Sequence, residues 1–138
     1  MDATLVLCDA AQEQGGKLYV LGGGWSLVHV PNVPVTMALA VIIGVPWDQA
    51  NDQLQVDALL MDEDGQLVQA ETEPERFQPV AASAQLEVGR PAGLKRGMTL
   101  NAPFAFTFNG VALPPGGYRW ELQINGSVEA TAPFRVLG

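Results

Sequence analysis

Carboxylates are the most numerous side chains in this sequence that could do chemistry. Nine of them, and no base, lie within residues 48–75. Asp62 and Asp64 belong to an acidic turn at 62–65, and carboxylate and carbonyl oxygens in loops of this kind bind hard cations such as Ca²⁺. An EF-hand is excluded because Leu60 would occupy its first ligand position. Asp62 and Asp64 are therefore candidate ligands of a looser calcium site at a sheet tip. The alternative is a solvated acidic loop that keeps a sheet edge from aggregating.

Nucleophiles and bases are scarce. His29 is the sole histidine and Cys8 the sole cysteine, so no zinc site of the usual His and Cys composition can be assembled. Ser26, Ser83 and Ser127 could pair with His29, but none of these serines lies in a G-x-S-x-G elbow. The sequence therefore predicts a protein that is not an enzyme, with no catalytic residue and no cofactor.

Aromatic side chains offer a second kind of site. Trp120 alternates in phase with Leu122, which assigns it to the core, whereas Trp47 stands at a strand end, where an indole can stack on a sugar or anchor a protein partner. Trp25 follows three glycines at 22–24, whose spacing matches neither G-x-G-x-x-G nor a P-loop. We expect a bulge or a crossover between sheets there. Trp47 and Trp25 are the candidate interaction residues.

Side-chain alternation with a period of two indicates which elements position these residues. It recurs at 54–60, 104–108 and 118–124, and no helical spacing is sustained over three turns. Asn125-Gly126 predicts a type I′ hairpin turn, and Tyr118 after a Pro-Pro-Gly-Gly turn suggests a tyrosine corner.

These runs and turns predict an all-β fold with about nine strands, which are too many for one flat sheet. We expect a single domain over 1–138, a two-sheet antiparallel β-sandwich of the immunoglobulin-like or C2/jelly-roll-like Greek-key kind. The region 71–97 is the least regular part of the sequence. The run 35–45 is apolar or small on both faces, which predicts a central strand covered on both sides or lying in an interface.

Charge excludes whole classes of partner. Fifteen acidic and seven basic residues give a formal net charge of −8, so phosphate backbones and anionic lipids repel the protein. We therefore expect neither nucleic-acid binding nor membrane binding. Met1 is followed by an acid where a secretory signal has a basic region, and the single cysteine excludes a disulfide within the chain. Both observations favour the cytoplasm, with Cys8 a reduced, packed thiol.

The opening of the chain resembles a known family. Leu7-Cys8-Asp9-Ala10 is followed by Gly-Lys-Leu-Tyr-Val-Leu-Gly-Gly-Gly-Trp at 16–25, and Pro-Gly-Gly-Tyr lies near the end of the chain at 115–118. These stretches resemble an uncharacterised family of small bacterial proteins that is frequent in actinobacteria. The resemblance implies a compact β-sandwich and brings no catalytic residues.

The function expected from these observations is a non-catalytic interaction or assembly module with an unidentified protein partner, itself a homo-oligomer. The two-sided run 35–45 is the reason for expecting an oligomer, because one of its faces would need a cover. A small-ligand, carbohydrate-binding or calcium-binding module that uses Trp47 and the sheet-tip carboxylates is the alternative.

Overall fold

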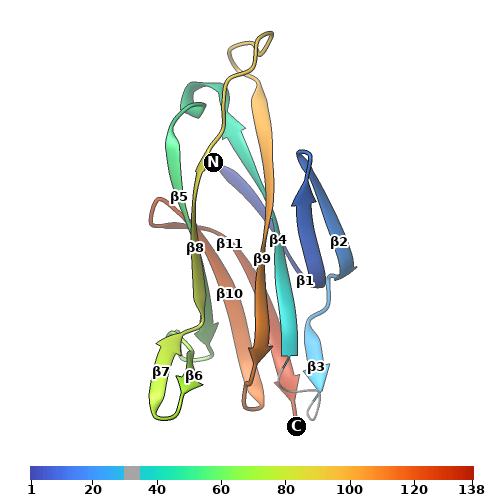
Figure 1. Ribbon diagram of the computed structural model, residues 1–138, viewed down its shortest axis with the longest axis vertical. Helices are drawn as coiled ribbons and strands as arrows, with labels where there is room; N and C mark the ends of the chain where they lie inside the picture. Colours follow the sequence, from blue (N-terminus) through green and yellow to red (C-terminus); the bar gives the residue numbers. More distant parts are fainter. Residues whose placement is uncertain (30–34) are drawn as a thin grey trace.

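Two β-sheets face each other across one apolar core in the computed structural model, which describes residues 1–29 and 35–138 (Figure 1). Sheet A contains, in spatial order, β2 (Lys17–Gly23), β1 (Asp2–Gln14), β4 (Val35–Pro46) and β9 (Thr99–Val111). Sheet B contains β3 (Leu27–His29), β11 (Ser127–Leu137), β10 (Gly116–Ile124), β5 (Gln53–Asp62) and β8 (Ala81–Glu87). A small hairpin of β6 (Gln69–Glu73) and β7 (Arg76–Pro79) stands beside sheet B, and a 3₁₀ helix, η1 (Trp47–Gln49), follows β4.

The predicted all-β sandwich is confirmed, with two corrections of detail. The described residues form eleven strands and not about nine, because β7 and β8 lie in the region 71–97 that we expected to be irregular. From Ala82 to Glu87 the residues of β8 alternate between apolar and polar side chains, but two of the three apolar ones are alanines, so the apolar signal is weak. The strands pair antiparallel except β3 and β11, which run parallel.

The core is formed by the inward residues of the central strands. Its largest fully buried side chains include Trp120, Met37, Leu39 and Ile43. Trp120 packs on Phe108, with ring centroids 4.3 Å apart. Phe104, Phe106 and Phe108 pack against this core but are only half-buried, because β9 is the edge strand of sheet A.

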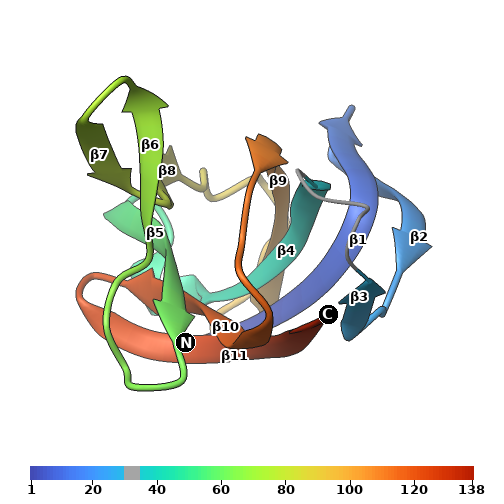
Figure 2. The ribbon, with the colours of Figure 1, turned by 90° about the horizontal axis from the view of Figure 1, so that it is seen from below.

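The second apolar face of β4 is covered by the chain itself. β1 is strongly curved, and the β1–β2 hairpin turns back over the outer face of sheet A (Figure 2). There Ala11 and Leu18 of the hairpin pack against Cys8, Ala38 and Ala40, which are at most 1% exposed. The expectation that this face of β4 needs a partner is therefore wrong, and any argument for an oligomer must rest on another surface.

The Cys8 thiol lies in this apolar cluster under the hairpin and donates a hydrogen bond to the carbonyl of Ala38 over 3.4 Å. Burial raises the pKa of Cys8, the backbone hydrogen bond at Ala40 lowers it, and the charge of Asp9 raises it further. Because the thiolate is the reactive form of cysteine, this thiol is suited to a structural role and not to nucleophilic chemistry.

Two predicted turns have the expected geometry. Asn125 and Gly126 both have positive φ, 50° and 86°, as a type I′ turn requires. The hydroxyl of Tyr118 donates to the carbonyl of Pro114 over 2.7 Å, which closes the loop before β10 as a tyrosine corner.

Tyr118→Phe should destabilise the protein by about 1 kcal/mol at neutral pH, because it removes this hydrogen bond. Burial raises the pKa of Tyr118 above its ordinary value of 10.0, with further contributions from Asp62 and Glu63. The neutral hydroxyl therefore stabilises the fold fully below pH 10.0 and loses this effect as the pH rises through the folded-state pKa.

Urea unfolding between pH 7 and pH 11 measures both effects of Tyr118→Phe. Tyr19→Phe is the control, because the Tyr19 side chain is 57% exposed. Equal stabilities of the two variants at neutral pH would show that the Tyr118 hydrogen bond contributes nothing.

Candidate functional site

β2 is an edge strand of sheet A. This strand pairs with β1 along one side, and its other side forms the outer margin of the sheet, with no neighbouring strand among the described residues. Tyr19, Val20 and Leu21 are 57%, 40% and 71% exposed. No proline lies in β2, and its one charged residue, Lys17, is at its start. Edge strands are usually protected by such residues, so this unprotected edge, which we call the β2 edge, is the candidate functional site.

The backbone of the β2 edge is oriented for pairing. Gly15 and Gly16, both with positive φ, form the two-residue turn of the hairpin, so Gln14 and Lys17 on either side of it are a hydrogen-bonded pair. Hydrogen-bonded and non-hydrogen-bonded pairs alternate along an antiparallel ladder, and the register of β1 with β2 is constant from Lys17 to Leu21. The backbone groups of Tyr19 and Leu21 therefore bond to β1, and the amide and carbonyl groups of Leu18 and Val20 point toward the open side. The side chains of Tyr19 and Leu21 share the outer face of the hairpin, opposite the face on which Leu18 packs against the Cys8 cluster.

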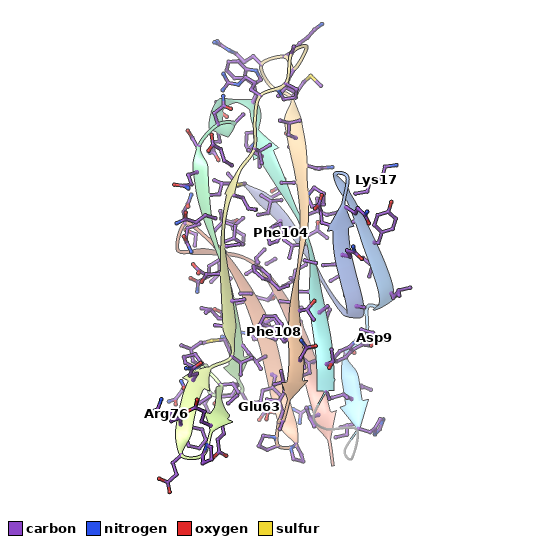
Figure 3. The ribbon with its side chains drawn as sticks, in the orientation of Figure 1. Asp9, Lys17, Glu63, Arg76, Phe104 and Phe108 are labelled. Carbon is purple, nitrogen blue, oxygen red and sulfur yellow. The ribbon has the colours of Figure 1, made fainter. Side chains whose placement is uncertain are left out.

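The hairpin carries opposite charges at its two ends. Lys17 is at the tip and Asp9 is near the base (Figure 3). Asp9 faces Gly22, whose φ is 61°, and a Cβ added to Gly22 would collide with Oδ2 of Asp9. Only a glycine therefore leaves room for this carboxylate to lie over β2. Glu13, which is also near the tip, accepts a hydrogen bond from the amide of Gly16 over 2.9 Å.

Trp47, one of the two predicted interaction residues, is half-buried in η1, which lies before the start of β5, whereas the acidic turn follows the end of that strand. The guanidinium of Arg90 lies 3.8 Å from the centroid of its ring, and that of Arg96 lies 5.1 Å away. Arg90 also donates through Nη2 to the carbonyl of Trp47 over 2.8 Å. A cavity of about 460 Å³ opens beside the indole, but arginine side chains of the protein itself stack on its ring.

Trp25, the other predicted interaction residue, lies where the chain passes from β2 in sheet A to β3 in sheet B, which is the crossover that the glycine run predicted. Its ring is half-buried and meets Phe134 edge to face, with centroids 5.8 Å apart. Its Nε1 is buried, without a hydrogen-bond partner in the described part of the chain. This indole anchors the crossover to the core.

The two candidate calcium ligands, Asp62 and Asp64, lie in one turn. Asp62 closes this turn, because its carboxylate accepts hydrogen bonds from the amides of Asp64 and Gln66, each 2.9 Å long. Neighbouring Glu63 accepts from the amide of Gly117 over 2.7 Å and from Nη2 of Arg135 over 2.6 Å. Within residues 1–29 and 35–138, no group of three or more His, Cys, Asp and Glu side chains is arranged to hold a metal ion.

Sequence reasoning did not single out the β2 edge as a site. The signal was present in Leu18-Tyr19-Val20-Leu21, four consecutive apolar residues that break the period of two. Such a run predicts a strand covered on both faces, as β4 is. Only the structure shows that no second layer covers the outer face of β2.

A family of unknown function, DUF6941, matches residues 3–137. The chain belongs to this family. This finding agrees with the predicted resemblance to an uncharacterised family, while the bacterial origin of that family stays a prediction. No curated protein matches this DUF6941 protein.

One solved structure that resembles this DUF6941 protein is the Pseudomonas fluorescens alkylpurine DNA glycosylase AlkC, bound to DNA that contains an abasic site analogue. The two chains are 14% identical, with a TM-score of 0.43, and the match covers 82% of this chain but only 28% of the glycosylase. This likeness carries no argument about function. Among the described residues, no helix has the length and apolar character needed to cross a membrane.

Proposed function

We propose that this DUF6941 protein is a non-catalytic interaction module that binds another protein chain by strand addition at the β2 edge. The observation that carries the proposal is the exposure of three consecutive apolar side chains, Tyr19, Val20 and Leu21, on an edge strand that no further described strand pairs with. An added strand forms main-chain hydrogen bonds with such an edge, and its alternate side chains cover the apolar ones.

The other sheet edges are less suited to strand addition. β9 carries Pro103, which has no amide hydrogen to donate. β8 exposes Ser83, Gln85 and Glu87 and no large apolar side chain. β3 is three residues long. Among the described edge strands, β2 alone is longer than three residues, exposes large apolar side chains and contains no proline.

A small-ligand or calcium-binding module has less support. The ring of Trp47 already stacks with Arg90, and Asp62 already accepts two backbone amides. We further propose the cytoplasm as the compartment, because Cys8 is the sole cysteine and is packed as a reduced thiol under the hairpin.

Photo-crosslinking from two positions tests the proposed function. A benzophenone amino acid in place of Leu21, in cells of the source organism, should crosslink to a protein chain after irradiation. The same amino acid in place of Phe77 is the matched control, because Phe77 is similarly exposed, 61% against 71%, but lies on the separate β6–β7 hairpin. Equal crosslinking from both positions, or none from Leu21, would contradict the proposal.

A further inference from the structure

We propose that the chain bound at the β2 edge is a second copy of this protein, with the two β2 strands paired antiparallel about a two-fold axis at Val20. This inference rests on the proposed function and specifies its partner. Joining the two copies would produce one continuous sheet of eight strands, four from each copy.

The register follows from the length of the strand and the direction of its backbone groups. β2 spans Lys17–Gly23, so full overlap of two antiparallel copies centres on Val20. Tyr19 of each copy then lies opposite Leu21 of the other. Because the amide and carbonyl of Val20 face the open side, the two Val20 residues form a hydrogen-bonded pair. Tyr19 and Leu21 form the non-hydrogen-bonded pairs, where side chains approach most closely.

The side chains are complementary in this register. Tyr19 and Leu21 are on the outer face of the hairpin, so four exposed apolar side chains, two from each copy, would meet on one face of the joined sheet. Aromatic and aliphatic side chains directly opposite each other stabilise a sheet. At each end, Lys17 faces Gly23, which has no side chain to obstruct the lysine.

Charge favours antiparallel over parallel pairing. Lys17 and Asp9 are at opposite ends of the hairpin, as Figure 3 shows. Antiparallel pairing brings Lys17 of each copy to the end where Asp9 of the other copy lies over β2, whereas parallel pairing would place Lys17 beside Lys17. Lys17 forms no ion pair in the described part of the chain.

The position of β2 leaves room for a second copy. In Figure 2 it lies at the margin of the molecule, with β1, β4 and β9 all on one side of it. β2 also contacts β9, but among the described residues no strand pairs with its open edge.

Sedimentation velocity of the purified protein at micromolar concentration tests the pairing. We expect a species of twice 14.7 kDa. Leu21→Lys places a lysine from each copy in the interface and should weaken the dimer by about tenfold or more. Phe77→Lys makes the same change of charge at an exposed site outside the interface and should leave the dimer intact. Equal dissociation of both variants, or a monomeric wild type, would overturn the inference.

A disulfide tests the register. Val20→Cys in a Cys8→Ala background should form a disulfide between two copies on mild oxidation, because hydrogen-bonded antiparallel pairs have Cα atoms about 5.5 Å apart, a separation that a disulfide spans. Leu27→Cys in the same background is the control, since Leu27 is 56% exposed on β3. Equal yields from the two positions would contradict pairing about Val20.

The charge argument has its own test. Lys17→Asp should weaken the dimer, and Lys17→Asp combined with Asp9→Lys should recover it, because the exchange restores opposite charges at each end. A double variant no tighter than the single variant would contradict the antiparallel arrangement.

Self-pairing and the broader function can fail separately. Crosslinking of Leu21 to a different protein, together with a monomeric purified chain, would overturn self-pairing and leave the interaction module in place. A monomeric chain with no crosslink from Leu21 would overturn both.

Discussion

Replacing Trp120 by alanine lowers the free energy of unfolding by about 3–5 kcal/mol, because it empties the largest side-chain volume in the core. The indole is fully buried, in the middle of β10, and its neighbours across the two ladders are Leu60 and Ala132. Phe108 would lose its main contact, a ring whose centroid lies 4.3 Å away. A domain of ordinary stability, about 5–15 kcal/mol, would retain only a small margin.

The indole nitrogen of Trp120 indicates where the expected loss of unfolding free energy lies between these limits. Nε1 of Trp120 is buried without a hydrogen-bond partner among the described residues, so its removal also relieves an unsatisfied donor. We therefore expect the lower half of the range. Urea unfolding followed by far-ultraviolet circular dichroism measures it, and Val128→Ala on neighbouring β11 is the control, because Val128 is 51% exposed. A loss of less than about 1 kcal/mol for Trp120→Ala would contradict this account of the core.

The parts of the fold predicted from the sequence are those determined by local chemistry. The period of two at 118–124 places Trp120 in the core because neighbouring residues of a strand point to opposite faces. Asn125-Gly126 specifies a turn because those two residues adopt positive φ at low cost. β7 and β8 were missed because the alanines of β8 give little contrast between buried and exposed positions.

The parts that could not be predicted depend on contacts between distant segments. Whether the second face of β4 is free or covered depends on the bend of β1, which the sequence does not reveal. The exposure of Leu21 depends likewise on the absence of a neighbouring strand. Asp62 closes a turn here, but a carboxylate that closes a turn and one that binds a cation have the same sequence signature.

Ala40→Asp is the second change with a large expected effect, and it tests how the hairpin is held. Ala40 is 1% exposed, beneath Ala11 and Leu18 of the hairpin. A carboxylate there would be buried without a partner, and we expect a loss of about 3 kcal/mol or more at pH 7. Ala81→Asp is the matched control, because it makes the same change at an exposed position of β8.

The effect should depend on pH in a defined direction. Burial would raise the folded-state pKa of the introduced carboxyl above its unfolded value of about 3.9. The folded state then binds the proton more tightly, so the destabilisation is smallest below pH 4 and grows as the pH rises toward the folded-state pKa. A loss at pH 7 that did not shrink on acidification, after correction by the Ala81→Asp control, would contradict this explanation.

Labelling of the Cys8 thiol shows whether Ala40→Asp disturbs the hairpin alone or the whole protein. In the wild type it is fully buried under the hairpin, and burial raises its pKa, so a thiol reagent should label it slowly. If Ala40→Asp detaches the hairpin while sheets A and B stay together, labelling accelerates and the circular dichroism of the sandwich persists. Because the hairpin presents Leu21, the same variant should lose the photo-crosslink from that position. Protection of Cys8 equal to that in the Ala81→Asp control would show that the hairpin is not held by this cluster.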